Sequence, residues 1–284
     1  MILIADSGST KTDWCVTNGE NVVCQLYGQG INPFQQSKET ISDIVFKDVA
    51  NRIPDTGEIN EIYFYGAGCR DEMKPLIKDV LTKHFINAEH TEVNSDLMAA
   101  ARALLGNRKG IACILGTGSN SCLYDGSEIT DNTPPLGYIL GDEGSGAVLG
   151  RMFVNALFKN QLADDIKKTF LDKTRLTLSD IIDKVYRQPL ANRFLASLSP
   201  FIHDLSDNKA VRNIIVDNFR NFFKLNIDQY RQQGAEINAI GSIAFYYKKE
   251  LAEAAEAECY KLGTVIKSPM SGLVKYHTNT ETIQ

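Results

Sequence analysis

The chain has 284 residues, of which 43% are hydrophobic and 23% charged, a composition typical of a globular protein with room for two domains. The formal net charge of -5 gives no overall attraction to nucleic acid or to an anionic membrane, so we expect neither as a partner. No apolar run approaches the roughly 20 residues of a membrane span. The amino end shows no signal-peptide pattern, and we therefore expect a cytoplasmic protein.

The first part of the chain alternates strand and helix patterns. The apolar run Ile2–Ala5 predicts a buried strand, and strands at Trp14–Thr17 and Val22–Tyr27 are expected around an Asn18-Gly19 hairpin turn. Asp96 begins a helix whose apolar residues recur at helical spacing. Between the hairpin and Asp96, helices and strands are expected in alternation at Lys38–Arg52, Ile59–Tyr65, Glu72–Phe85 and Thr91–Asn94.

The same pattern restarts after Gly106-Asn107. The units IADSGSTKTDWCV and CILGTGSNSCLY each combine an apolar strand, a polar turn and a hairpin partner, and so form a pseudo-repeat. We predict an α/β protein of two similar domains facing across a cleft, residues 1–106 and 107–284, the second with a helical insertion at about 160–232. In the second domain we expect strands at Gly110–Leu115, Cys122–Tyr124 and Ile237–Ile240, and helices at Ser145–Lys159, through most of Leu162–Arg231, and at Phe245–Leu262.

The turn after the first strand, DSGSTKT at positions 6–12, has the composition of a phosphate-binding loop. Glycine lets backbone N–H groups approach an anion closely, and the serine and threonine hydroxyls add donors. Lys11 would add positive charge, and Asp6 could hold a divalent cation such as Mg²⁺ through water. The spacing is not that of a P-loop, and taken alone the segment is also compatible with a simple turn.

Four further motifs each leave two interpretations open. GTGSNS at 116–121 is a plain turn alone, but two matched turns can grip a polyphosphate from both sides. Asp142 is either an acid at a helix N-terminus or a group that reaches metal-bound water or substrate hydroxyls. Gly241-Ser242 either caps a helix or packs against adenine and ribose. Asp96 is either an N-cap or, at the carboxyl end of a strand, an acid that accepts the proton of an attacking hydroxyl.

In this order, the motifs resemble the N-acetylglucosamine kinase and BadF-type ATPase family, within the sugar kinase, heat-shock chaperone and actin superfamily. DSGSTKT and GTGSNS are similar to its two phosphate motifs, GYILGDEGSG to the GxxxGDEGS segment of the amino-sugar kinases, and GSIA to the adenosine motif. The resemblance spans about residues 1–272. It implies two RNase H-like (actin-like ATPase) domains with ATP and Mg²⁺ in the cleft between them.

The resemblance also implies roles for individual residues. Asp6 is expected to face the metal, and Asp96 to be the general base on the sugar hydroxyl. Ser7 stands where the family usually has glycine, and Leu136 where vertebrate-type amino-sugar kinases have an aromatic residue. The expected ATP contacts are Ser7, Gly8, Ser9, Thr10, Lys11, Thr117, Gly118, Ser119, Gly241 and Ser242. The expected sugar contacts are Asn32, Asp96, Asn120, Gly137 and Asp142.

The leading hypothesis is an ATP-dependent kinase for an N-acetylglucosamine-like amino sugar or a related small hydroxylated compound. By analogy with the family we also expect a homodimer. The alternative is a BadF-type ATPase that activates a partner enzyme, like activators that hold an iron–sulfur cluster between two subunits. Cys113 and Cys122 flank GTGSNS, but their strand positions do not suit such a cluster, and we expect the cysteines to be structural free thiols. Asp96 and GDEGS disfavour a regulator without catalysis.

Overall fold

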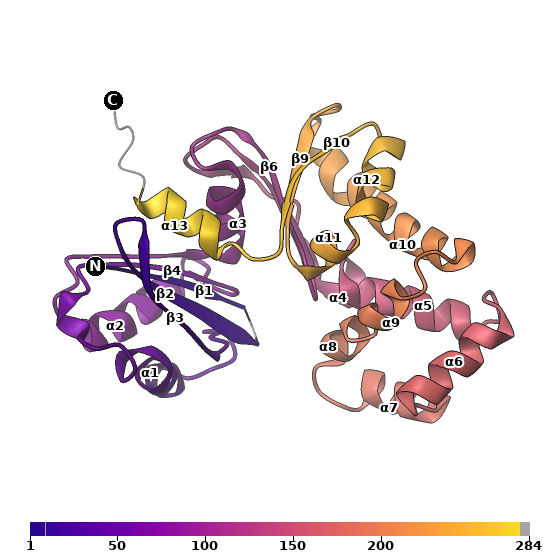
Figure 1. Cartoon of the computed structure of the whole chain (residues 1–284), viewed down its shortest axis with the longest axis horizontal. Helices are drawn as coiled ribbons and strands as arrows, with labels where there is room; N and C mark the ends of the chain where they lie inside the picture. Colours follow the sequence, from indigo (N-terminus) through magenta and orange to yellow (C-terminus); the bar gives the residue numbers. More distant parts are fainter. Residues whose placement is uncertain (9, 279–284) are drawn as a thin grey trace. The chain divides into compact units, whose positions relative to one another are not determined.

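The computed structural model describes residues 1–8 and 10–278, and the chain forms two compact units (Figure 1). The first unit comprises residues 1–107 together with the segment from Pro269 onward, and the second comprises residues 108–268. The sequence-based division placed the segment after Pro269 with the second domain. It falls in the first unit because the last described helix packs against elements of that unit.

The first unit is built on a mixed five-stranded sheet in the order β3-β2-β1-β4-β5. β1 pairs antiparallel with β2, and β2 with β3, whereas β1–β4 and β4–β5 are parallel. The three parallel strands therefore bring their carboxyl ends to one edge of the sheet. The strands are β1 (Ile2–Ser7), β2 (Lys11–Asn18), β3 (Asn21–Gln29), β4 (Glu61–Gly66) and β5 (His90–Ser95).

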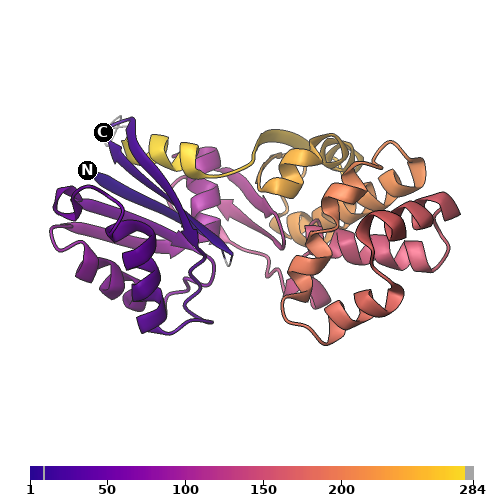
Figure 2. The ribbon, with the colours of Figure 1, turned by 60° about the horizontal axis from the view of Figure 1, so that its bottom comes forward.

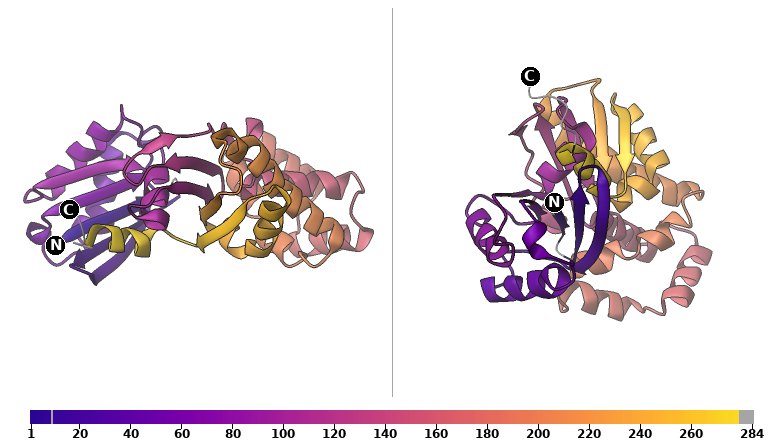
Figure 3. Two further views of the ribbon diagram at one scale, coloured as in Figure 1. Left: turned by 90° about the horizontal axis from the view of Figure 1, so that it is seen from above. Right: turned by 60° about the vertical axis from the view of Figure 1, so that its left-hand side comes forward.

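Helices cover both faces of this sheet (Figures 1 and 3). α1 (Lys38–Val45) continues as a π-helical turn at Phe46–Ala50 and packs with α2 (Lys74–His84) on one face. Their apolar residues, such as Ile41 and Ile77, join a buried core with residues of the strands. α3 (Asp96–Leu105) and α13 (Met270–Thr278) lie on the other face.

α13, the yellow helix, lies against elements of the first unit (Figure 2). Close packing and an aromatic cluster hold it there. Gly272 contacts α3 so closely that a Cβ atom there would overlap the backbone of Ala103. The His277 ring stacks on Tyr63 with 3.6 Å between centroids, and its Nε2 lies 2.7 Å from the Tyr65 hydroxyl. These contacts hold α13 against β4 and against α3, the helix that begins at Asp96.

The second unit repeats the strand arrangement of the first. Its sheet has the order β10-β9-β6-β7-β8, in which β6 pairs antiparallel with β7 and parallel with β9, as β1 does with β2 and β4. The shared topology is the structural basis of the pseudo-repeat in the sequence. The strands are β6 (Gly110–Leu115), β7 (Ser119–Tyr124), β8 (Ile129–Asp131), β9 (Glu236–Ile240) and β10 (Lys261–Ile266).

The helices of the second unit surround a large apolar core. Phe153, Phe170, Phe219 and Tyr247 are among its buried aromatic residues. A run of helices between α5 and β9 occupies most of the region in which the sequence predicts a helical insertion. The helices are α4 (Gly137–Leu140), α5 (Gly146–Phe158), α6 (Asp164–Thr174), α7 (Leu178–Tyr186), α8 (Ala191–Ala196), α9 (Ser199–His203), α10 (Lys209–Phe222) with turns Phe223–Ile227 and Asp228–Tyr230, α11 (Ser242–Tyr246) and α12 (Lys248–Ala257).

The predicted helix Phe245–Leu262 is wrong at its carboxyl end. α12 ends at Ala257, the chain turns at Cys259 with φ 63°, and a strand begins at Lys261. Pairing of β10 with β9 satisfies backbone groups that the sequence pattern assigned to a helix. Gly263 lies in β10, where a Cβ atom would come within 2.5 Å of the Glu236 side chain. Within the described residues, no helix is long and apolar enough to cross a membrane.

Candidate active site

Polar residues gather at the carboxyl edge of the first sheet, where the parallel strands β1, β4 and β5 end. Ser7 of β1 pairs with Gly66 of β4, and Gly66 pairs with Ser95 of β5. Asp6 precedes the first of these positions and Asp96 follows the last. The register thus brings two acids that are distant in the sequence to the same edge, which is where ligands bind in open α/β sheets.

Asp6 is held in an environment that disfavours its charge. Burial, the nearby carboxylate of Asp96 and then that of Asp13 raise the pKa of Asp6 to about 7, against a smaller lowering effect of Lys11. Asp13 lies directly opposite Asp6 in the β1–β2 pairing, and Gln25 donates hydrogen bonds to both of its carboxylate oxygens, at 2.8 and 3.0 Å. Burial also raises the pKa of Asp13.

Asp13 was not among the residues singled out from the sequence. A signal for it was present, because Asp6 and Asp13 are placed symmetrically about the turn and a hairpin register would have paired them.

Asp96 occupies the first position of α3, and it is not the helix N-cap. The cap is Ser95, whose hydroxyl accepts the Met98 N–H at 3.3 Å. This arrangement frees the Asp96 carboxylate from the capping role that one interpretation of the sequence gave it. Burial raises the pKa of Asp96, while hydrogen bonds from its own N–H and that of Leu97 act in the opposite direction. A carboxylate at this position is therefore a stronger proton acceptor than an ordinary aspartate.

Asn32 lies in the segment that follows β3, near the loop after β4. Its side-chain oxygen accepts the Phe34 N–H at 3.0 Å and would lie only 2.6 Å from a Cβ atom at Gly68. Gly68 has φ 78°, so both its conformation and its space require glycine. The next residue, Cys69, is buried, and burial together with the Asp96 charge raises the pKa of its thiol to about 12.

The turn between β1 and β2 contains most of the predicted phosphate contacts of the first unit. Gly8, Thr10 and Lys11 are exposed, and the Gly8 N–H bonds the Lys11 carbonyl at 3.0 Å. Ser7 differs from them, since it is fully buried and its hydroxyl bonds within the unit. The predicted contact Ser9 lies outside the described residues.

The equivalent turn of the second unit lies between β6 and β7. Thr117 is exposed and Gly118 partly so, whereas Ser119 is 6% exposed. The Ser119 hydroxyl is buried and has no hydrogen-bond partner within the described residues. The side-chain oxygen of Asn120 accepts hydrogen bonds from the Ser121 N–H and from the Asn132 amide, both at 2.9 Å.

Asp142 connects this turn to the loop that precedes α5. Its carboxylate accepts the N–H groups of Ser119 and Gly137, and its oxygen would lie 3.0 Å from a Cβ atom at Gly118. Burial is the main cause that raises the pKa of Asp142 to about 6, and the Glu143 charge adds to it, whereas the Ser119 and Gly137 N–H groups lower it. Asp142 has φ 56°, a conformation that aspartate tolerates better than most residues.

Asp142 is not in the first turn of α5, because Ser145 is the N-cap and accepts the Val148 N–H at 3.1 Å. The loop is fixed further by backbone bonds from Gly146 to Gly116, at 2.8 Å, and from Ala147 to Thr117, at 3.1 Å. The GDEGS segment therefore serves as a support for the second polar turn.

Gly137 begins the short helix α4 next to an exposed apolar residue. Gly137 has φ 75°, and its neighbour Leu136 is also left-handed with φ 62°. Leu136 is 63% exposed. This is the position at which vertebrate-type amino-sugar kinases were expected to carry an aromatic residue.

Gly241 lies at the junction of β9 and α11, against the strand that leads into the second polar turn. Its φ of 118° and its contact with the Leu115 carbonyl, which a Cβ atom would overlap, both require glycine. Gly241 is the N-cap of α11 and makes no side-chain cap, so the exposed hydroxyl of Ser242 does not cap the helix.

Cys113 and Cys122 lie inside the second sheet. Both are fully buried, and they belong to the paired strands β6 and β7. Burial raises the pKa of both thiols. Neither thiol can reach the surface as a ligand of a cluster shared between two subunits. Four of the six cysteines of the chain are buried, and all six are free.

The residues around Asp6 fit a hydrated divalent cation. After burial, the charges of Asp96 and Asp13 raise the pKa of Asp6, and a cation would relieve this repulsion. Within residues 1–8 and 10–278, no group of three or more His, Cys, Asp and Glu side chains is arranged to hold a metal ion by itself. Mg²⁺ needs no such group, since it keeps several waters and takes one or two carboxylates together with phosphates.

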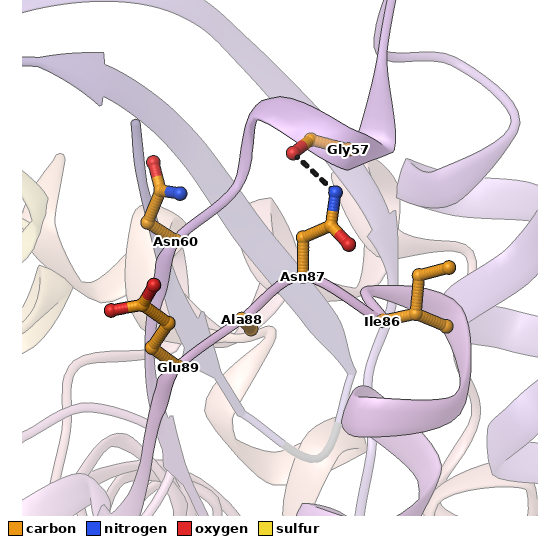
Figure 4. Close-up of a pocket in the computed structure, with 6 residues that line it drawn as sticks. All are labelled: Gly57, Asn60, Ile86, Asn87, Ala88 and Glu89. Atoms are coloured by element: carbon orange, nitrogen blue, oxygen red, sulfur yellow. Dashed lines mark hydrogen bonds between the residues drawn. The ribbon is translucent and has the colours of Figure 1, made fainter.

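A surface pocket lies at the opposite edge of the first sheet (Figure 4). It is found where β4 and β5 begin, and the Asn87 side chain donates a hydrogen bond to the Gly57 carbonyl at 3.0 Å within it. None of the sequence-predicted site residues belongs to this pocket, so it is not the candidate site. Its lining residues are Gly57, Asn60, Ile86, Asn87, Ala88 and Glu89.

Comparisons with known proteins find similarity to kinases of amino sugars. No family model matches the chain. A solved structure from Porphyromonas gingivalis, provisionally assigned as an N-acetylglucosamine kinase, is 45% identical, with a TM-score of 0.96 over 99% of this chain and 100% of that one. An N-acetylmuramic acid/N-acetylglucosamine kinase of Clostridium acetobutylicum is 25% identical over 210 residues, 70% of this chain and 68% of that protein.

A more distant structure shares the fold. It is a ROK family glucokinase from Streptomyces griseus in complex with glucose and AMPPNP, 14% identical, with a TM-score of 0.58 over 96% of this chain and 97% of that one. With these neighbours and the two repeated sheets, the predicted α/β fold of two RNase H-like, actin-like ATPase domains is confirmed.

Proposed function

The chain belongs to the N-acetylglucosamine kinase family, and from this premise we propose that it transfers the γ-phosphate of ATP to a hydroxyl of N-acetylglucosamine or a closely related amino sugar. Family membership rests on the 45% identity over almost the whole chain. The coarser assignment, a sugar kinase, follows from it directly. The sugar and the role of each residue are the proposal.

The observation that carries the proposal is the position of Asp96. The carboxylate lies at the carboxyl edge of the sheet, free of the capping role, and burial raises its pKa. We assign it as the general base, which accepts the proton of the sugar hydroxyl as that oxygen attacks the γ-phosphorus. The bond from the γ-phosphorus to the bridging oxygen breaks, and ADP leaves with that oxygen.

Asn32 is the proposed sugar contact in the first unit. Its side-chain oxygen is occupied by the Phe34 N–H, so its amide group is the part that remains to donate to a sugar hydroxyl. Gly68 borders this position. In the second unit the proposed contacts are Asn120 and Gly137, with Asp142 holding the loops on which both lie.

The two glycine-containing turns supply the proposed phosphate contacts. In the first unit these are Gly8, Thr10 and Lys11, all exposed, and in the second Thr117, Gly118 and Ser119. Backbone N–H groups, hydroxyls and the Lys11 ammonium would orient the triphosphate. Gly241 and Ser242, of which Ser242 is exposed, are the proposed contacts of the adenosine. When bound, Mg²⁺ supplies charge neutralisation on the phosphates, and Asp6 is the residue that would hold it.

An acceptor panel tests the proposal. ADP release from ATP is measured with N-acetylglucosamine, N-acetylmuramic acid, N-acetylmannosamine and glucose, and the mass of each sugar is determined afterwards. We expect ADP release that depends on an N-acetylated amino sugar, with one phosphate gained by that sugar. ADP release of the same rate without any sugar, or unchanged masses throughout the panel despite ATP binding, would contradict it.

A further inference from the structure

Ser7 belongs to the DSGSTKT segment, but its hydroxyl bonds inside the first unit. It ends β1 and has no exposed surface. Its Oγ accepts the Ile31 N–H at 2.9 Å, lies 2.8 Å from the Thr12 Oγ1 and is 3.2 Å from the Ile31 carbonyl oxygen. Thr12 is equally buried and donates its own proton to the Gln29 carbonyl at 2.8 Å.

The number of hydroxyl protons limits which group donates in each of these bonds. A hydroxyl has one proton to donate. Since Thr12 donates to Gln29, it can only accept from Ser7. The Ser7 proton has two acceptors, the Thr12 Oγ1 at 2.8 Å and the Ile31 carbonyl at 3.2 Å, and the Ser7 Oγ accepts the Ile31 N–H. The bonds form a chain that begins and ends on the backbone of residues 29–31. Ser7 of β1 and Thr12 of β2 thus both hydrogen-bond to the segment at the end of β3. We call the bonds among Ser7, Thr12 and residues 29–31 the hydroxyl clamp.

The clamp joins two parts of the site that bind different substrates in the proposed function. On one side of Ser7 is the turn with the exposed Gly8, Thr10 and Lys11. On the other, Ile31 immediately precedes Asn32, the proposed sugar contact. The Gly30 N–H also bonds the Thr10 carbonyl at 3.1 Å, so the two segments touch at a second point.

We propose that Ser7 is a positioning residue that sets the place of Asn32 relative to the phosphate-binding turn, and that it is not a nucleotide contact. The proposal rests on the proposed function and adds to it a residue that determines acceptor binding. Loss of the hydroxyl leaves the Ile31 N–H buried without its partner. The segment then shifts to find another partner, and Asn32 moves with it.

The kinetics of Ser7→Ala test the proposal. We expect the KM for the amino sugar to rise so that kcat/KM for the sugar falls about tenfold, with the KM for ATP within about twofold of wild type. Ser7→Thr keeps the hydroxyl and should restore most of the sugar KM. Ile59→Val is the matched control, because Ile59 is a fully buried residue of the same unit, at the other edge of the sheet, and its truncation lowers stability without touching the clamp.

A second readout does not require activity. Amide hydrogen exchange of residues 29–32 should be faster in Ser7→Ala than in wild type or Ile59→Val. If Ser7→Ala does not fold, Thr12→Val breaks the next bond of the clamp and should change the sugar KM and the exchange in the same direction. An unchanged sugar KM in the Ser7 and Thr12 variants, or an equal rise in Ile59→Val, would overturn the proposal. A wild-type chain that phosphorylates no amino sugar would defeat the proposed function alone, since the exchange still reports the clamp.

Discussion

Substitution of Asp6 should make the protein more stable at neutral pH and inactive as a kinase. The pKa of Asp6 is raised from an ordinary 3.8 to about 7 by burial and by the charges of Asp96 and Asp13. Its protonated form therefore favours the folded state. That contribution is complete below pH 4 and is lost as the pH rises to about 7, because the folded chain must then carry the buried charge.

The magnitude follows from the size of this difference. Three pH units at about 1.4 kcal/mol each give about 4 kcal/mol as the upper limit for Asp6→Asn at pH 8. An asparagine amide still needs partners in the same place, so we expect about half of that gain in the free energy of unfolding. In a chain of this size, a gain of about 2 kcal/mol raises the Tm by about 5 °C.

Thermal unfolding of Asp6→Asn and wild type at pH 8 and pH 5 measures this effect. The Tm of the variant should exceed that of wild type clearly at pH 8 and by less at pH 5, where folded wild type is mostly protonated at Asp6. Asp43→Asn is the control, since Asp43 is exposed on α1. A variant that is less stable than wild type at pH 8, or equally stabilised at both pH values, would refute the electrostatic reasoning.

Two further substitutions test the second unit. Asp142→Ala removes the acceptor of the Ser119 and Gly137 N–H groups. We expect the free energy of unfolding, measured by denaturant titration, to fall by about 2–4 kcal/mol and the KM for ATP to rise. An unchanged KM for ATP would show that Asp142 does not support the turn. Gly241→Ala places a Cβ atom against the Leu115 carbonyl at φ 118° and should cost about 3 kcal/mol or more, whereas Gly19→Ala, in an open turn, should cost less. Equal losses in the two glycine variants would contradict the close packing.

The sequence was sufficient for the fold because its signals are local and repeated. Apolar runs followed by glycine turns appear in both halves, and each became the first strand of a sheet with the same strand order. The first two residues of β10, Lys261 and Leu262, were assigned to a helix because the preceding residues favour one. α13 was missed for a different reason, since its place is set by contacts with α3 and with Tyr63 and Tyr65.

For the candidate site, the sequence indicated which segments are polar but not how their atoms are used. It grouped Ser7 with the phosphate contacts, although the fold directs that hydroxyl to Ile31. The sequence did not decide whether Asp96 is a helix N-cap or a general base, and in the structure the N-cap is Ser95. Asp142 was expected to contact a ligand, and the sequence did not indicate that its carboxylate accepts two backbone N–H groups. Such distinctions depend on which donor meets which acceptor, and only tertiary packing decides that.

The most direct test of the central claim compares Asp96→Asn with wild type in two measurements on the same preparations. We expect the kcat for amino-sugar phosphorylation to fall by about a hundredfold to ten-thousandfold, because the base is lost, while ATP binding measured by calorimetry stays within about twofold. Asp43→Asn should match wild type in both. Retention of the wild-type kcat in Asp96→Asn would contradict the account.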